Sequence, residues 1–240
     1  MKQYEEVIDA IKSLGGIASL REINRQILPQ VQSHWGTKTP FASIRRIVQT
    51  RREIYKIKPG LYCLSAEKDR YASLYDLPEK GEGNEAVLNR NHYYYQGILL
   101  EIGNARRQKT YVSSQDKNRK FINTPLKELC DYEKLPAFGY SSLMKEAKSI
   151  DVIWFNDRKM PSFAFEVEIS TDINRSLIKF YSLQDFHMRM AVVAPAARKR
   201  EFVDKIAQNI FQDIRQRVEF FDLHKVEKLY EQSLKASIIL

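Results

Sequence analysis

The sequence contains few of the residues that build disulfide bonds or zinc sites. It has two cysteines and four histidines among 240 residues. Cys63 and Cys130 lie far apart and have no metal-ligand spacing, so the sequence gives no reason to expect a zinc site. We expect both cysteines to be buried thiols rather than a disulfide, because no export signal precedes them.

The sequence also lacks a long hydrophobic run. None approaches the roughly 18 residues needed to span a bilayer, and the opening stretch, MKQYEEVIDAIK, has the pattern of a charged amphipathic helix rather than of a signal peptide. A glycine-rich phosphate-binding loop is missing as well. We therefore expect a cytoplasmic protein with no membrane partner and no nucleotide cofactor.

Negative charge is in deficit. The 39 Lys and Arg residues exceed the 30 Asp and Glu residues, which gives a formal net charge of +9 at pH 7. The excess is concentrated between Lys38 and Lys58, where seven basic residues accompany a single acid, Glu53. A basic balance of this kind favours a polyanionic partner such as nucleic acid. The alternative is a solvated basic helix.

The first helices are predicted from apolar spacing and from capping residues. A hydrophobic stripe predicts an amphipathic helix over residues 3–13. Ser19, followed three residues later by Glu22, predicts a capping box at the start of a second helix. Pro29 is expected to end that helix, because proline lacks the amide hydrogen that the helical ladder needs.

A third helix and a hairpin complete the N-terminal pattern. Thr39 is a suitable N-cap and Pro40 suits the first helical position. Phe41, Ile44 and Val48 are expected to face inward. The runs IYKIK and LYCLS alternate on either side of a Pro-Gly pair, which predicts a β-hairpin. Together these elements predict a winged helix-turn-helix over residues 1–65.

Residues 1–65 resemble the HARE-type helix-turn-helix family. The resemblance rests on the first helix, on EI in the second, on KTP at the start of the third and on IYKIKPGLYCL. The family is linked to DNA-associated proteins, including restriction endonucleases, so the resemblance implies a double-stranded DNA partner. A winged helix that contacts only proteins remains the alternative. The residues expected to contact DNA are Lys38, Ser43, Arg45, Arg46, Gln49, Arg51, Arg52, Lys56 and Lys58.

The remaining chain is predicted to be a connector followed by a second domain. Residues 66–91 are expected to form the connector, because LPEKGEGNE combines proline, glycine and charge. Over residues 92–240, helical patterns alternate with β-prone runs, which predicts a mixed sheet flanked by helices. The predicted fold class is therefore α/β, with an α+β winged helix and a mixed-sheet domain, two domains in all.

One strand of this second domain carries an unusual pair of charges. In FAFEVEIS, alternation puts Glu166 and Glu168 on one face, about 7 Å apart. If IDVIWF and SFAFEVE pair around a turn at Arg158 and Lys159, Asp151 lies opposite Glu166. Repulsion among three clustered carboxylates should raise the pKa of at least one of them. A bound Mg²⁺ ion would remove this repulsion. A sheet face exposed to water is the alternative.

This arrangement resembles the PD-(D/E)xK nuclease superfamily. Asp151 is followed by Glu-x-Glu on the next strand and then by a helix, and FEVEISTDINRSLIKF and VVAPAARKREF are similar to a type II restriction-endonuclease pattern in which glutamate replaces the usual lysine. The resemblance implies Asp151 and Glu166 as metal ligands, with Glu168 also serving the metal site. Lys179 is the candidate for the missing cationic role, unless it is a solvated helical lysine.

The activity implied is that of a Mg²⁺-dependent restriction-type endonuclease, with Mn²⁺ as an acceptable substitute. It would hydrolyse phosphodiester bonds in double-stranded DNA at a specific sequence. The recognition sequence and any dependence on methylation are left open. One active site per chain fits either a homodimer or sequential nicking. A non-catalytic winged-helix regulator, whose α/β domain senses a ligand or partner, is the alternative function.

Glu101 is a further catalytic candidate. It shares the apolar face of the predicted helix GILLEIGNA with Ile98 and Ile102, and buried glutamate is rare unless it is paired or bound to a metal. Superfamily members often supply an extra acid from this helix. A core carboxylate satisfied by an N–H group or an arginine is the alternative, and Gln96 on the same helix is a weaker candidate.

Overall fold

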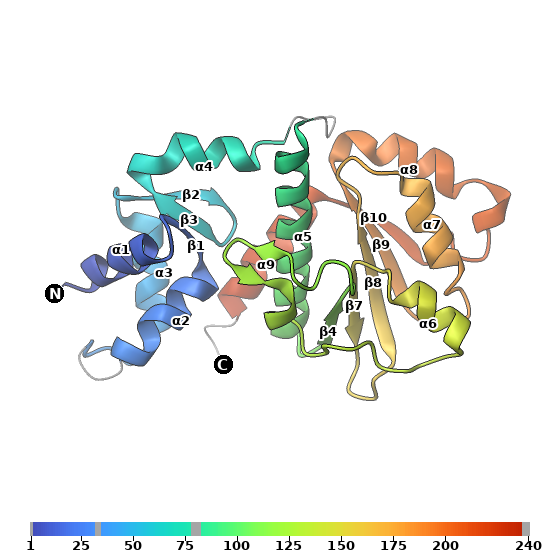
Figure 1. Cartoon of the computed structure of the whole chain (residues 1–240), viewed down its shortest axis with the longest axis horizontal. Helices are drawn as coiled ribbons and strands as arrows, with labels where there is room; N and C mark the ends of the chain where they lie inside the picture. Colours follow the sequence, from blue (N-terminus) through green and yellow to red (C-terminus); the bar gives the residue numbers. More distant parts are fainter. Residues whose placement is uncertain (1, 32–34, 78–82, 237–240) are drawn as a thin grey trace. The chain divides into compact units, whose positions relative to one another are not determined.

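The computed structural model describes residues 2–31, 35–77 and 83–236, and it divides the chain into two compact units (Figure 1). Unit 1 comprises Met1–Asp76, Ile122–Thr124 and Glu231–Leu240, and unit 2 comprises Leu77–Phe121 and Pro125–Tyr230. No helix in the described ranges combines the length and the apolar character that crossing a membrane requires.

Unit 1 packs helices around a small antiparallel sheet with the order β1-β3-β2. The three predicted helices and the predicted hairpin are confirmed, and the hairpin turns at Pro59 and Gly60. Their assignment to a winged helix-turn-helix stays a prediction. The elements are α1 (Gln3–Ser13), β1 (Ile17–Ser19), α2 (Leu20–Val31), α3 (Pro40–Thr50), β2 (Ile54–Lys58), β3 (Leu61–Leu64) and α4 (Lys68–Tyr75).

The predicted capping box at the start of α2 is confirmed. The backbone N–H of Ser19 donates to Glu22 Oε2 at 2.8 Å, and the backbone N–H of Glu22 donates to Ser19 Oγ at 3.1 Å. The second carboxylate oxygen, Oε1, accepts from the Thr124 hydroxyl at 2.7 Å and from the Asn123 N–H at 3.1 Å. One buried glutamate therefore caps a helix and also anchors residues 122–124 in unit 1.

Two expectations for unit 1 were wrong. Pro29 does not end α2 but lies within it, and the helix continues to Val31. So close to the C-terminal end, the missing amide hydrogen bond affects only the last turn. Phe41 is 48% exposed, whereas Ile44 and Val48 are buried as expected. Phe41 lies in the first turn of α3, before the helix meets the core of unit 1.

A mixed five-stranded sheet with the order β10-β9-β8-β7-β4 forms the centre of unit 2. β8, β9 and β10 are parallel neighbours, whereas β7 runs antiparallel to β8 and β4. The predicted α/β class is confirmed. The elements after residue 77 are α5 (Glu85–Ala105), β4 (Lys109–Val112), β5 (Lys120–Phe121), β6 (Thr124–Pro125), α6 (Ser141–Ala147), β7 (Val152–Phe155), β8 (Pro161–Val167), α7 (Ile173–Tyr181), β9 (Arg189–Ala194), α8 (Lys199–Ile206), β10 (Val218–Asp222) and α9 (Leu223–Ala236).

Helices cover both faces of this sheet, with α5 on one side and α6, α7 and α8 on the other (Figure 1). The Phe163 and Phe165 rings stack at 4.3 Å on the α5 side. Ala164, between them in sequence, packs in the cluster that contains Leu177 of α7. Alternation along β8 therefore turns Glu166 toward α7.

The predicted connector contains regular structure. Within residues 66–91 the chain forms α4 and the beginning of α5. The helix that contains GILLEIGNA begins at Glu85, before the expected domain start at residue 92. The Asn84 side chain caps it by accepting a hydrogen bond from the Val87 N–H at 2.9 Å. Residues 78–82 of the expected hinge lie outside the described residues. The compact units divide between Asp76 and Leu77, and the domain limits 1–65 and 92–240 stay predictions.

Candidate active site

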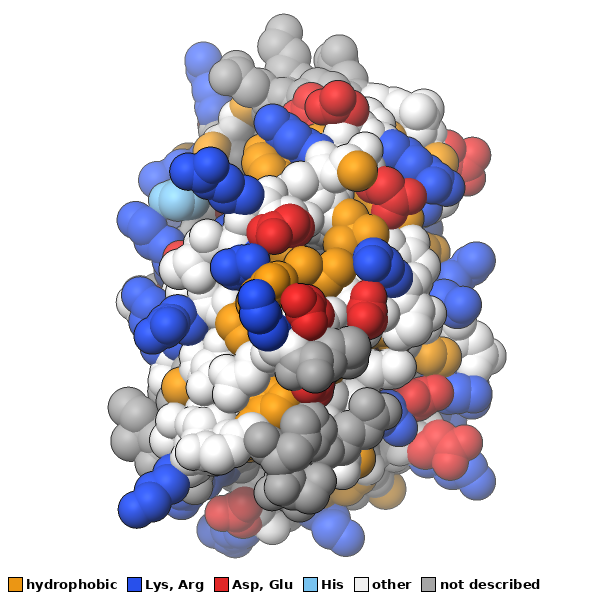
Figure 2. All heavy atoms as spheres, turned by 90° about the vertical axis from the view of Figure 1, so that its left-hand side faces the viewer, with side chains coloured by type: hydrophobic (Ala, Val, Ile, Leu, Met, Phe, Trp, Pro, Cys, Tyr) orange, Lys and Arg blue, Asp and Glu red, His pale blue; other side chains and the backbone are white. Residues whose placement is uncertain are grey.

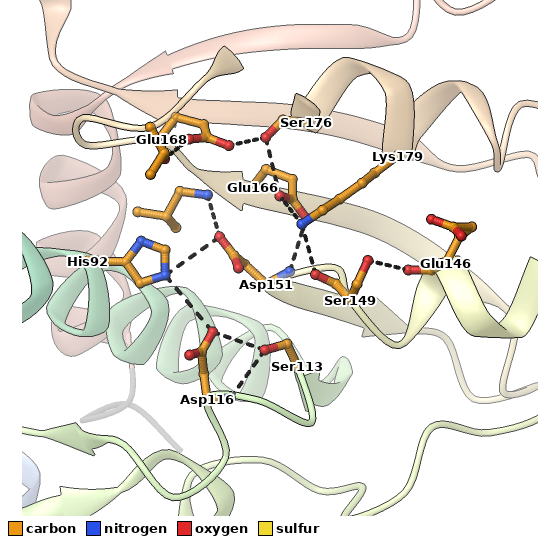
Figure 3. A network of polar contacts seen from close by, with 12 residues as sticks. His92, Ser113, Asp116, Glu146, Ser149, Asp151, Glu166, Glu168, Ser176 and Lys179 are labelled. Atoms are coloured by element: carbon orange, nitrogen blue, oxygen red, sulfur yellow. Dashed lines mark hydrogen bonds and ion pairs between the residues drawn. The ribbon is translucent and has the colours of Figure 1, made fainter. Parts of the chain in front are cut away.

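Asp151 and Glu166 meet across β7 and β8 (Figure 3). The strands pair Val152 with Phe165, so the register expected from the sequence is confirmed. The backbone N–H of Asp151 donates to Glu166 Oε1 at 3.2 Å, and the backbone N–H of Val167 donates to Asp151 Oδ2 at 2.8 Å. These two bonds fix both carboxylates, which are 7% and 2% exposed respectively.

Lys179 reaches this pair from α7. Its Nζ donates to Glu166 Oε2 at 2.7 Å and to the Ser149 carbonyl oxygen at 2.9 Å. Burial alone would lower the pKa of Lys179, but the adjacent carboxylate of Glu166 outweighs it and the pKa is raised. Lys179 therefore carries its positive charge inside the site and is not a solvated helical lysine.

Glu168 lies one residue beyond the end of β8 and is held by hydroxyl groups. The side chains of Ser176 and Thr171 both donate to its carboxylate. The Ser176 hydroxyl also lies 3.2 Å from Glu166 Oε2, so it links the two glutamates. Arg198 donates to the backbone carbonyl oxygen of Glu168 at 2.9 Å, which holds the chain in place after the strand.

Burial governs the electrostatics of the three carboxylates. It raises the pKa of Asp151 and of Glu168, and it raises the pKa of Glu166 well above the ordinary glutamate value, with the nearby Asp151 charge adding to the effect. Lys179 supplies one positive charge against three acids. The site therefore has a surplus of acidic groups that a divalent cation could neutralise.

Two further polar side chains approach Asp151 from another direction. His92 Nε2 on α5 lies 3.8 Å from Asp151 Oδ2 and 4.0 Å from Asp116 Oδ2. Asp116 accepts hydrogen bonds from Ser113 Oγ and from Gln96 Nε2, each at 2.9 Å. His92, Asp116 and Asp151 each offer one ligand atom, and these three atoms lie within 4.8 Å of one another, close enough for one metal ion.

The sequence interpretation missed His92 and Asp116. The available signal was the β-prone run TYVSSQ, which directly precedes Asp116. β4 pairs with β7, and the Ser113 N–H donates to the Asp151 carbonyl oxygen at 3.1 Å. If TYVSSQ is paired with IDVIWF as a neighbouring strand, Asp116, which directly follows TYVSSQ, comes to lie beside Asp151. His92 lies one helical turn before Gln96, which the sequence marks only as a weaker candidate.

Residues 76–238 match the family model of the type II restriction enzyme NmeDI C-terminal domain. The chain belongs to this family. The matched range contains the three buried carboxylates, Lys179, His92 and Asp116. Membership identifies a restriction-type endonuclease domain, and such enzymes act on DNA. No curated protein and no solved structure matches the chain.

Glu101 does not join the acidic cluster of this NmeDI-family domain. It is 8% exposed, as its apolar face predicted, but its carboxylate accepts a hydrogen bond from the Tyr230 hydroxyl on α9. Glu101 follows His92 by nine residues, which turns it about 180° around α5. The structure thus places Glu101 and His92 on opposite sides of one helix.

The residues expected to contact DNA lie in unit 1, outside the NmeDI match, and have different surroundings. Lys38, Arg46 and Arg52 are exposed, whereas Ser43 and Lys58 are half-buried. Figure 2 views the left-hand side of Figure 1 and shows Lys and Arg side chains spread over this face, with acidic and hydrophobic side chains between them. The basic residues on this face therefore do not form one uninterrupted block.

The other expected DNA contacts either pair with residues of unit 1 or line a cavity there. The Arg51 guanidinium lies 3.6 Å from the centre of the Tyr4 ring, and Arg51 pairs with Glu53 at 3.3 Å. Lys56 Nζ lies 2.6 Å from Glu231 Oε1. Arg45, Gln49 and Lys56 line a cavity of about 160 Å³, together with Glu231, Leu234 and Lys235 of α9. The C-terminal end of α9 thus lies beside part of the face expected to bind DNA.

Proposed function

We propose that the chain is a Mg²⁺-dependent type II endonuclease that hydrolyses phosphodiester bonds in double-stranded DNA at a specific sequence. One observation carries the proposal: within a domain of the NmeDI family, Glu166 is bonded to Lys179 and is linked to Asp151 by a backbone N–H and to Glu168 by the Ser176 hydroxyl. Strand, Glu-x-Glu and helix follow in the order that the PD-(D/E)xK superfamily uses. This supports assigning the domain to that superfamily.

The cofactor we propose for the acidic cluster is a divalent metal ion. Asp151 and Glu166 would hold Mg²⁺, with Glu168 as the third acid and Mn²⁺ as a substitute. Oxygen ligands and incomplete charge compensation suit such an ion. When bound, the cation polarises the phosphodiester and lowers the pKa of an attacking water.

Lys179 and Glu168 would act directly on the reacting groups. Lys179 is held by Glu166 and by the Ser149 carbonyl oxygen, so its charge is preorganised to stabilise the negative charge that develops on the phosphate. Glu168 would orient the water and accept its proton as the oxygen bonds to phosphorus and the bond from phosphorus to the leaving sugar oxygen breaks. Its raised pKa makes it a stronger base than an exposed glutamate.

Unit 1 would supply the DNA contacts. We propose that α3 and the β2–β3 hairpin form a HARE-type winged helix whose basic residues bind phosphates and whose third helix reads base edges. The exposed Lys38, Arg46 and Arg52 are available for this role. A double-strand cut by one active site per chain would require a homodimer or two successive nicks.

Cleavage of defined DNA tests the proposal. Supercoiled plasmid and genomic DNA, methylated and unmethylated, would be incubated with the full chain and Mg²⁺ or EDTA, and the cut ends would be sequenced. We expect Mg²⁺-dependent ends at one recognition sequence, and transient nicked circles would distinguish sequential nicking from a concerted dimer. Glu166→Gln should abolish cutting, while Glu133→Gln, at an exposed position, should not.

Two results would contradict the proposal. Failure of the wild-type protein to cut any of these DNAs would favour the non-catalytic regulator. Equal cutting by wild type and Glu166→Gln would remove the active site from this cluster.

A further inference from the structure

The amide group of Gln96 lies between a histidine on α5 and an aspartate that follows β4. Its Nε2 is 2.9 Å from His92 Nε2 and 2.9 Å from Asp116 Oδ2. An imidazole nitrogen that carries no proton presents a lone pair to this point, as the carboxylate oxygen does. The amide hydrogens thus occupy a position that attracts positive charge from two sides.

The other end of the same amide is poorly satisfied. Gln96 is fully buried, and its Oε1 has no hydrogen-bond partner among the described residues. A half turn about the last side-chain bond exchanges the amide oxygen and nitrogen. With a cation present, that turn would direct the oxygen toward the metal.

We propose that His92, Asp116 and Asp151 bind a divalent transition-metal ion, with Gln96 turning its amide oxygen toward it. The proposal deepens the nuclease function, because Asp151 belongs both to the acidic cluster with Glu166 and to this group. It rests on the nuclease function only for the catalytic use of the ion. In Figure 3, Asp151 lies between His92 on one side and Glu166 with Lys179 on the other. A cation here would neutralise the negative charge of Asp116 and Asp151, which lie on the side away from the positive charge of Lys179.

The ligand geometry fits with modest adjustment. The ligand atoms lie within 4.8 Å of one another, and His92 Nε2 is 3.8 Å from Asp151 Oδ2. An ion with bonds near 2.1 Å holds adjacent ligand atoms about 3 Å apart and opposite ones about 4.2 Å apart. Ser113 donates to Asp116 at 2.9 Å and so orients the carboxylate.

The mixed donor set predicts metal preference. An imidazole nitrogen suits transition metals, whereas Mg²⁺ prefers a shell of oxygen atoms. We therefore expect Mn²⁺ to bind this site more tightly than Mg²⁺. A site made only of Asp151 and the two glutamates would lack nitrogen altogether.

Mn²⁺ binding to the full chain without DNA tests the proposal. Calorimetry would give the affinity, and pulsed electron paramagnetic resonance would detect ¹⁴N coupled to bound Mn²⁺. The variants are His92→Gln and Asp116→Asn, matched by His187→Gln and Asp185→Asn at exposed positions. Circular dichroism would establish that each variant is folded.

We expect ¹⁴N coupling in the wild-type protein and its loss in His92→Gln. Mn²⁺ affinity should fall about tenfold or more in His92→Gln and in Asp116→Asn, and the two controls should bind as wild type does. Absence of ¹⁴N coupling in the wild type, or unchanged affinity in both variants, would overturn the proposal. Should one variant not fold, the wild-type spectrum and the other variant still decide.

The same samples separate this inference from the nuclease proposal. Mn²⁺ bound with ¹⁴N coupling in a protein that cuts no DNA would uphold the site and reject the nuclease. DNA cleavage with Mg²⁺ and no nitrogen signal from Mn²⁺ would uphold the nuclease and reject His92 as a ligand.

Discussion

The ammonium group of Lys179 lies 2.7 Å from Glu166 Oε2 and 2.9 Å from the Ser149 carbonyl oxygen, with 18% of its side chain exposed. These bonds direct a half-buried positive charge at the acidic cluster. Replacing the lysine removes that charge but keeps a long apolar stem when methionine is used. Lys179 can therefore be tested for catalysis and stability together.

We predict that Lys179→Met lowers the rate of DNA cleavage by about 100-fold or more, because a preorganised charge on the reacting phosphate is lost. At neutral pH, without divalent cations, the variant should lose about 3 kcal/mol of unfolding free energy, because Glu166 is left buried without its partner. Cleavage kinetics and denaturant unfolding measure the two effects. Lys145→Met, at an exposed position, is the control. An unchanged cleavage rate would remove Lys179 from the site.

We predict that Asp151 lowers the stability of the folded protein and is required for DNA cleavage. Burial, with a smaller contribution from the Asp116 charge, raises the pKa of Asp151, so its ionised form is disfavoured in the folded protein. Asp151→Asn keeps an oxygen that can accept the Val167 N–H and removes one charge from the cluster. We expect the variant, without metal, to be about 1 kcal/mol more stable than wild type and inactive in DNA cleavage.

Thermal unfolding in EDTA and cleavage in Mg²⁺ measure these two properties of Asp151→Asn. The exposed Asp185→Asn should change neither. A strongly destabilised Asp151→Asn would mean that the aspartate is mainly a structural hydrogen-bond acceptor.

The sequence predicted those parts of the site that neighbouring segments determine. A short turn joins β7 and β8, so alternation and strand length were enough to place Asp151 opposite Glu166. Lys179 follows on the next helix, within reach of the same face. These relationships involve short separations along the chain, and the local pattern constrains them.

The parts that were missed depend on distant segments. His92 reaches the cluster only because α5 packs against the sheet, and Asp116 only because β4 pairs with β7 after a long irregular stretch. The burial of Glu101 followed from its helix, but its Tyr230 partner is 129 residues away. Local periodicity predicts which face of an element is buried, but not which distant side chain it meets.

Glu168 should make stability depend on pH. Burial raises its folded-state pKa above the unfolded value of about 4.3, so the folded protein holds this proton more tightly than the unfolded chain does. The stability from this group is fully present below about pH 4.3 and is lost as pH rises through the folded-state pKa. Glu168→Gln, which cannot ionise, should therefore become steadily more stable relative to wild type over that interval.

Denaturant unfolding of both proteins in EDTA, measured from about pH 4 to about pH 9 in steps of about one pH unit, would give this difference in stability. The exposed Glu133→Gln supplies the baseline for removing a glutamate charge. A difference between wild type and Glu168→Gln that stays constant with pH would show that the folded site does not raise the pKa of Glu168.

The ion pair between Lys56 and Glu231 is predicted to restrain DNA binding by unit 1. The two groups lie 2.6 Å apart. Lys56, followed by Lys235 and Arg45, lowers the pKa of Glu231, which keeps that carboxylate negative. A phosphate approaching Lys56 would have to compete with this carboxylate. Glu231→Gln should therefore raise affinity for duplex DNA severalfold at low salt and steepen the salt dependence by about 0.9 for each additional phosphate that the protein neutralises.

Arg46→Gln provides the opposite case. Arg46 is exposed on α3, and its loss should weaken binding and reduce the salt slope by about 0.9. Fluorescence anisotropy with a labelled duplex at several salt concentrations, without Mg²⁺ so that the DNA stays intact, measures both variants. The exposed Glu133→Gln controls for the change in net charge of Glu231→Gln, and the exposed Arg158→Gln controls for that of Arg46→Gln. If neither Glu231→Gln nor Arg46→Gln differs from its control, α3 and the hairpin are not the DNA-binding face, because a charge that contacts phosphate must alter the number of counterions released.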